Sequence, residues 1–120
     1  MSTQPNTYLT PDQYLDIERA AEFKSEYLNG EMFAMAGARE ARNLLVMNLL
    51  GELREQLRSR PCRPYPSDMR VRVKPSLFTY PDVTVVCGEP QFLDERRDTL
   101  LNPDLIVEVL SPKWKEIVGA

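Results

Sequence analysis

The segment LIVEVLS at residues 105–111 constrains the fold of this chain more than any other. Such a dense run of Leu, Ile and Val is typical of a strand inside a sheet that is covered on both faces. Glu108 interrupts the run, and an ionised carboxylate in a buried strand is costly unless a cation, a metal or hydrogen-bond donors compensate its charge. The sequence therefore predicts a group that faces Glu108.

Two amphipathic patterns upstream of this strand predict helices. The stretch TPD at residues 10–12 provides an N-cap, a proline and an acidic first turn, which together predict a short helix over 11–20. Beginning at Val46, apolar residues recur at i, i+3, i+4, i+7 and i+11. This spacing indicates a helix over residues 39–58 that packs on a sheet through one stripe.

The remaining segments read as strands and turns. Asn29-Gly30 lies between two alternating segments and predicts a hairpin. Residues 68–74 alternate strictly and predict a half-exposed strand, and residues 80–88 predict a second strand with a proline near its start. A polar loop over 88–104 then leads to the strand at 105–111. This order predicts an α+β (mixed α/β) fold, and 120 residues suffice for a single domain over 1–120.

The chain contains no histidine, which excludes Ser-His-Asp triads, Cys-His pairs and HExxH zinc sites. Its two cysteines, Cys62 and Cys87, lack CxxC spacing, so we expect reduced thiols that act as small hydrophobic residues. The chemistry that remains is that of carboxylates with a hard cation such as Mg²⁺, aided by lysine. The first ten residues contain no signal-like apolar run and no stretch could span a membrane, so we expect a cytoplasmic location.

The basic residues are concentrated in the middle of the chain. The net charge is −3, yet residues 39–74 carry nine basic and four acidic residues, a net charge of +5. This segment is either a solvated face of mixed charge or a surface that contacts a phosphate backbone. On the second interpretation, Arg58 and Arg63 lie where they could follow nucleic acid.

Two carboxylates fall on consecutive predicted strands. If the strands at 80–88 and 105–111 pair in register, Asp82 and Glu108 share a face with opposed Cβ atoms about 5 Å apart. Such a pair either holds a proton or binds a divalent cation. The alternative is a buried ion pair between Glu108 and Arg42, Arg70 or Arg72. Arg42 lies on the inward stripe of the second helix, from which it could also bind a substrate phosphate.

Four segments of the chain form recognisable motifs: SEYLNGEMFAMAGA, SDMRVRV, TYPDVTVVCGEP and RRDTLLNPDLIVEVLSP. Together they resemble the Uma-two family of the restriction-endonuclease-like PD-(D/E)xK nuclease superfamily. The resemblance implies a core in which a helix packs on a mixed sheet, and a Mg²⁺-dependent (or Mn²⁺-dependent) hydrolysis of DNA phosphodiester bonds. By motif, Asp82 is similar to the acid of the PD strand and Glu108 to the second acid. Glu31, after the Asn-Gly turn, is similar to the acid of the family's NGE motif and is a further candidate metal ligand.

The resemblance also implies a catalytic lysine, which the ExK pattern would place at Leu110. Lys113 or Lys115 is the candidate replacement, and we take Lys113 as the catalytic residue. Members of the family are longer, so the chain resembles a member that is incomplete at its C-terminus. A sheet that lacks its later strands exposes an edge and an apolar face, from which we expect homo-oligomers.

Three functions are compatible with these patterns. The first is a metal-dependent endonuclease with Asp82 and Glu108 as ligands and with Arg42, Arg58, Arg63 and Arg70 as DNA contacts. The second is a non-catalytic module that binds nucleic acid or associates with itself. The third is a structural module whose inward carboxylates are all ion-paired. Binding of Mg²⁺ or Mn²⁺ separates the first from the other two.

Overall fold

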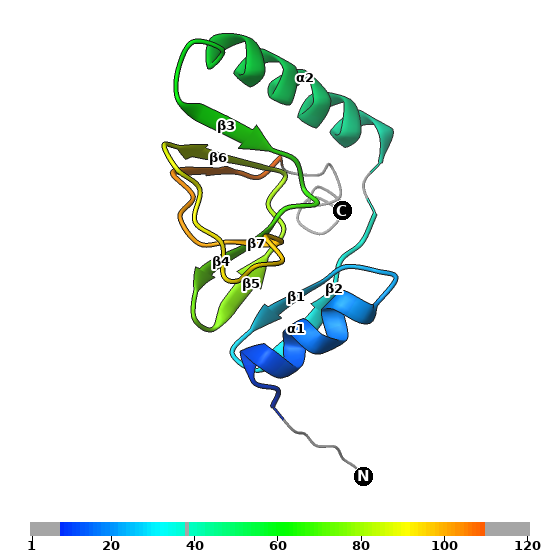
Figure 1. Cartoon of the computed structure of the whole chain (residues 1–120). Helices are drawn as coiled ribbons and strands as arrows, with labels where there is room; N and C mark the ends of the chain where they lie inside the picture. Colours follow the sequence, from blue (N-terminus) through cyan, green and yellow to red (C-terminus); the bar gives the residue numbers. More distant parts are fainter. Residues whose placement is uncertain (1–7, 38, 110–120) are drawn as a thin grey trace.

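The computed structural model describes residues 8–37 and 39–109, which form two helices and eight short strands (Figure 1). The strands build a five-stranded sheet in the order β2-β1-β5-β4-β7 and a three-stranded sheet in the order β3-β6-β8. Within the described residues all strand pairs are antiparallel except β4 with β7. The predicted α+β class is confirmed. The elements in chain order are α1 (Pro11–Ala20), β1 (Ser25–Leu28), β2 (Glu31–Ala34), α2 (Glu40–Gln56), β3 (Cys62–Tyr65), β4 (Arg70–Lys74), β5 (Leu77–Thr79), β6 (Val83–Cys87), β7 (Thr99–Leu100) and β8 (Leu105–Val107).

Helix α1 begins and ends where the sequence predicts. Its N-cap Thr10 accepts a hydrogen bond from the backbone N–H of Gln13, and the Gln13 side chain accepts one from the backbone N–H of Thr10. This reciprocal capping satisfies two amide groups that the first turn of a helix leaves without partners. Tyr14 lies on the buried face of α1 and packs against Tyr27 of β1 and Phe78 of β5. Its ring centroid is 5.0 Å from that of Tyr27 and 5.3 Å from that of Phe78. These rings form the core of the five-stranded sheet.

The predicted hairpin is also present. Strands β1 and β2 pair from Ser25↔Ala34 to Leu28↔Glu31, so Asn29 and Gly30 form a two-residue turn. Both turn residues have positive φ, 49° at Asn29 and 95° at Gly30. Turns of this kind match the right-handed twist of the strands, which explains why Asn-Gly is a strong hairpin signal.

The half-exposed strand expected at 68–74 differs from prediction at Arg70, which is buried with only 5% of its surface exposed. Its guanidinium contacts the Asp98 carboxylate at 3.0 Å and donates hydrogen bonds to Thr99 and Tyr80. Arg19 of α1 binds the same carboxylate at 2.8 Å and holds the pKa of Asp98 at about 2. The loop before β7 supplies the counter-charge that makes burial of Arg70 possible.

Strand β8 is shorter and more exposed than the sequence predicts. It spans Leu105–Val107, and within the described residues it lies at the edge of the three-stranded sheet, with β6 as its neighbour. Leu105 and Glu108 are exposed. The expectation of a strand covered on both faces is therefore wrong for residues 105–109, because no second layer covers the outer side in the described part of the chain; residues 110 and 111 lie outside it.

The cysteines form a disulfide, which corrects the expectation of reduced thiols. Strands β3 and β6 pair antiparallel, and their register places Cys62 directly opposite Cys87. The two residues are 25 positions apart in sequence, so their proximity depends on a strand, β3, that the sequence pattern did not predict.

Helix α2 lies over β3 at its C-terminal end and has little cover elsewhere (Figure 1). The predicted stripe from Val46 to Leu57 is half-buried, but none of the 17 residues of α2 is buried. Leu44, Leu45 and Met47 are 56%, 56% and 65% exposed. The apolar side chains of its first half therefore form an uncovered surface. None of the helices in residues 8–37 and 39–109 has the length and apolar character that a membrane crossing requires.

We predict that Gly30→Ala lowers the free energy of unfolding by about 1–2 kcal/mol, because a side chain at φ +95° is strained. A Cβ atom there would also lie 2.7 Å from the Cβ of Tyr8. The matched control is Gly51→Ala in α2, where nothing lies within 4 Å, and it should raise stability by about 0.5–1 kcal/mol. Urea unfolding curves of the two variants would measure both effects, and equal shifts would contradict the turn geometry.

Candidate active site

The pairing of β6 with β8 brings Asp82 and Glu108 together. The register runs Val83↔Val107, Thr84↔Ile106 and Val85↔Leu105, and the next step in the same register places Asp82 opposite Glu108. The backbone N–H of Asp82 donates to Oε1 of Glu108 at 3.4 Å. The predicted adjacency of the two strands is confirmed, and the two carboxylates lie at the end of the sheet where β6 begins.

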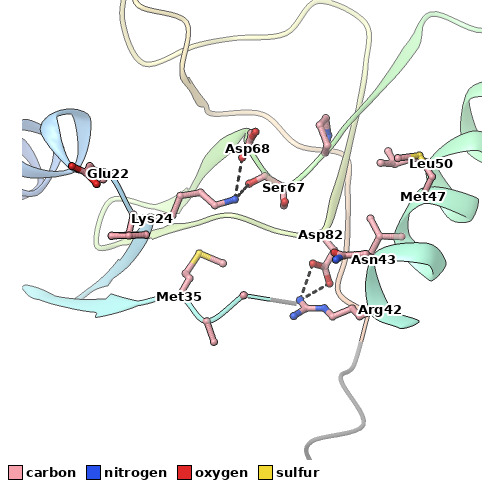
Figure 2. A pocket seen from close by; sticks show the side chains of 15 residues that line it. Glu22, Lys24, Met35, Arg42, Asn43, Met47, Leu50, Ser67, Asp68 and Asp82 are labelled. Carbon is pink, nitrogen blue, oxygen red and sulfur yellow. Dashed lines mark hydrogen bonds and ion pairs between the residues drawn. The ribbon is translucent and has the colours of Figure 1, made fainter. Parts of the chain in front are cut away.

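The cation that faces this pair comes from the first turn of α2. Figure 2 shows the Arg42 side chain reaching Asp82, with its Nη2 atom 2.7 Å from Oδ1 and 2.8 Å from Oδ2. The backbone N–H of Val109 donates to Oδ2 at 2.7 Å. The side chains of Asp82 and Arg42 are 10% and 24% exposed. The structure thus contains an ion pair of the kind considered for Glu108, but the carboxylate that Arg42 binds is Asp82.

Glu108 is more exposed, yet its pKa is raised above the ordinary value. Partial desolvation of the carboxyl group is the largest cause, and the charges of Asp82 and Glu26 raise the pKa further. The hydrogen bond from the backbone of Asp82 and the charge of Arg42 act in the opposite direction. Glu108 therefore holds its proton more tightly than a free carboxyl group, mainly because water is partly excluded from it.

The sequence did not predict that Glu26 raises the pKa of Glu108. It lies on β1, where its carboxylate accepts a hydrogen bond from the Thr79 hydroxyl. Glu31, which the family resemblance singled out, is exposed on β2 opposite Leu28, within the five-stranded sheet. In the described residues no three acidic, cysteine or histidine side chains gather closely enough to hold a metal ion together. Lys113 lies outside the described residues.

The donor set fits a magnesium site of the usual kind. Mg²⁺ is commonly held by one or two carboxylates and several waters, so Asp82 and Glu108 suffice without a third acid. Both oxygens of Asp82 also accept hydrogen bonds from within the protein. A metal ion at this carboxylate would meet Arg42.

A pocket of about 790 Å³ opens beside Asp82. Asp82 and Arg42 line one part of it, and Met47 of α2 contributes to an apolar wall (Figure 2). Lys24 and Asp68 line the pocket as well and form an ion pair of 3.1 Å. The volume falls in the range of ordinary ligand pockets, so a nucleotide-sized group has room next to Asp82.

The basic residues that were assigned to nucleic acid fall in different environments. Arg58 and Arg63 line a shallow depression of about 540 Å³ at the C-terminal end of α2, together with Arg54 and Arg60. Arg58 contacts Glu55 at 2.7 Å, but both side chains are exposed and such pairs are weak. Arg70 is buried and ion-paired, as described above, so it does not belong to an exposed basic surface. We call the group of Arg54, Arg58, Arg60 and Arg63 the basic depression.

The sequence of the chain matches one family model, Uma2, over residues 11–118, and that family is described as "Putative restriction endonuclease". The chain belongs to the Uma2 family. Among curated Uma2 relatives is the uncharacterized protein sll1609 of Synechocystis, which is 40% identical over 104 residues, covering 86% of this chain and 59% of the relative. The uncharacterized protein slr1290 of the same organism is 32% identical over 111 residues, covering 90% and 56%.

A solved structure shares the Uma2 fold. It is described as a putative nuclease of the DUF820 family from Anabaena variabilis, and it superimposes with a TM-score of 0.69 at 18% identity. The match covers 92% of this chain and 64% of that one. The present chain thus spans somewhat more than half the length of the curated Uma2 relatives it matches.

We predict opposite effects of neutralising the two carboxylates, measured by thermal melts with chelator present. Asp82→Asn leaves the largely buried Arg42 guanidinium without its counter-charge and should cost about 2–3 kcal/mol of unfolding free energy. Glu108→Gln retains an acceptor for the Asp82 N–H and removes a repulsion, so stability at neutral pH should be unchanged or higher.

The pH dependence provides a second measurement on the same proteins. A raised carboxyl pKa means that the folded state binds the proton more tightly than the unfolded state, so the contribution of Glu108 to stability falls as the pH rises above about 4.5. The stability difference between Glu108→Gln and the parent should therefore grow as the pH rises from below 4.5 through the raised pKa of Glu108. A difference that shrinks over this range would show that the folded protein favours the charged carboxylate.

Proposed function

We propose that this chain is a metal-dependent nuclease in which Asp82 and Glu108 bind Mg²⁺ or Mn²⁺ and support hydrolysis of phosphodiester bonds in DNA. The observation that carries the proposal is that Asp82 and Glu108 lie opposite each other across β6 and β8, with Asp82 lining a pocket of about 790 Å³. Membership of a family described as "Putative restriction endonuclease" supports it.

Each residue of the site has a chemical role in this proposal. A divalent cation bound here would polarise the scissile phosphate and lower the pKa of a bound water. Asp82, held in place by the N–H of Val109, and Glu108 would supply its protein ligands. Lys113, five residues beyond Glu108 in the sequence, is the lysine that we propose to accompany them. Glu31 is a more distant acid that we retain as an accessory ligand candidate.

In this proposal the DNA lies along α2, with the carboxylates at the N-terminal end of the helix. Arg42 and the basic depression lie at opposite ends of this helix, roughly 20 Å apart at the rise of an α-helix. Arginines bind phosphates through planar arrays of donors, so such a spacing suits several successive phosphates. Arg42, Arg58 and Arg63 remain the proposed contacts, whereas Arg70 is excluded by its burial.

A second candidate function is a non-catalytic module that binds nucleic acid or a second copy of itself. The uncovered apolar side chains of α2, Leu44, Leu45 and Met47, favour it, because apolar surface of this kind commonly marks an interface. Antiparallel pairing of two α2 helices would place the same patch on both copies, as two-fold symmetry requires. The two candidates differ in whether Asp82 and Glu108 matter for activity.

We predict that the protein cleaves a labelled duplex or supercoiled plasmid when Mg²⁺ or Mn²⁺ is added, and that chelator stops the reaction. Asp82→Asn and Glu108→Gln should abolish cleavage because each removes a metal ligand. The matched control is Glu95→Gln, which neutralises an exposed carboxylate in the loop before β7 and should cleave normally. If the duplex stays intact with either metal while folding and DNA binding are retained, the non-catalytic module is the better description.

The basic depression generates a separate prediction about DNA binding. The double variant Arg58→Glu/Arg63→Glu should weaken binding and lower the slope of log K against log salt by about 2, one unit for each lost phosphate contact. Lys74→Glu/Arg96→Glu makes the same change in net charge on exposed residues elsewhere and should leave the slope nearly unchanged. Fluorescence anisotropy at several salt concentrations measures both, and identical slopes in the two double variants would remove the basic depression from the interface.

A further inference from the structure

The contact between Arg42 and Asp82 has an unusual form for an arginine–carboxylate pair. Such pairs frequently use two guanidinium nitrogens in a fork. Here a single nitrogen, Nη2, lies between the two carboxylate oxygens at 2.7 and 2.8 Å, and the buried Nε has no hydrogen-bond partner. The positive charge thus lies end-on at the carboxylate, where a bound metal ion would also lie, and part of the donor capacity of the guanidinium is unused.

We propose that Arg42 occupies Asp82 in competition with the divalent cation, and that metal binding releases its guanidinium to a phosphate of the nucleic acid. This inference rests on the proposed function. Arg42 and Asp82 both line the same pocket, so the released side chain needs no movement of the backbone to reach a group bound there. A guanidinium that leaves a carboxylate finds in a phosphate its other preferred planar partner.

Charge balance makes simultaneous occupation unfavourable. Asp82 contributes one negative charge, and its Oδ2 atom already accepts from both Arg42 and the N–H of Val109. A divalent cation at the same carboxylate would lie within a few ångströms of the guanidinium in a site where Arg42 is 24% exposed, so solvent screening is incomplete. The cation and Arg42 are therefore expected to exclude each other from Asp82.

Thermodynamic linkage gives this competition a definite sign. If Arg42 opposes the metal, removal of its charge must strengthen metal binding, and metal must make Arg42 more available to phosphate by the same factor. If Arg42 instead only positions α2 against the sheet, its removal must weaken metal binding or leave it unchanged. The two roles are separated by the direction of one measured change.

The experiment is a calorimetric titration with MnCl₂ in the absence of DNA. Arg42→Gln should bind Mn²⁺ about tenfold more tightly than the parent, a size typical of coupling between two ligands. Arg42→Lys keeps the positive charge and should stay close to the parent. Arg96→Gln is the matched control: it removes one positive charge from an exposed residue in the loop before β7 and should leave the affinity unchanged.

Asp82→Asn separates this inference from the proposed function. If Asp82→Asn abolishes Mn²⁺ binding while Arg42→Gln binds no more tightly than the parent, the metal site stands and the competition is refuted. If neither the parent nor Arg42→Gln binds Mn²⁺, both proposals fall. Binding by Arg42→Gln but not by the parent would support the competition in its strongest form.

A measurement on the parent protein covers the case in which Arg42→Gln does not fold. The Nε–H resonance of Arg42 is identified in ¹⁵N spectra as the arginine signal that Arg42→Lys lacks. Addition of Mg²⁺ should shift this resonance, with the same midpoint as binding measured by calorimetry. A resonance that stays in place while Mg²⁺ binds would overturn the release of Arg42.

Discussion

The ion pair between Arg42 and Asp82 joins the first turn of α2 to the three-stranded sheet in which β6 and β8 are paired. Asp82 precedes β6, Arg42 belongs to the first turn of α2, and Val109, which also donates to Asp82, follows β8. Helix α2 has no buried residue with which to secure itself by apolar packing. One largely buried carboxylate therefore holds the start of the helix to the end of the three-stranded sheet, and the residue that we propose as a metal ligand also has a structural function.

Elements with strong local signals could be predicted from the sequence. The cap at Thr10 and the Asn29-Gly30 turn specify α1 and the first hairpin through interactions within a few residues. Strands β3, β5 and β7 are only two to four residues long and lack an alternating pattern, so their existence depends on partners far away in sequence. Strand β7 in particular pairs in parallel with β4, and its sequence indicates only part of a polar loop.

The candidate site was predictable to a similar extent. Period-two alternation placed Asp82 and Glu108 on one face, and helical periodicity turned Arg42 towards the sheet. Which carboxylate the arginine would bind was not encoded in spacing, because it depends on where α2 lies along β6. The burial of Arg70 could not be predicted from the sequence either, because its counter-charge, Asp98, comes from a loop 28 positions later. The charge of Glu26 reaches the site only through sheet topology.

The disulfide between Cys62 and Cys87 closes a covalent ring that contains β4, β5 and Asp82 itself. In the chain-entropy model, a cross-link across 25 residues removes about 3.5 kcal/mol of freedom from the unfolded chain. Because Asp82 lies inside this ring, reduction of the disulfide would enlarge the unfolded ensemble of the very segment that carries the carboxylate.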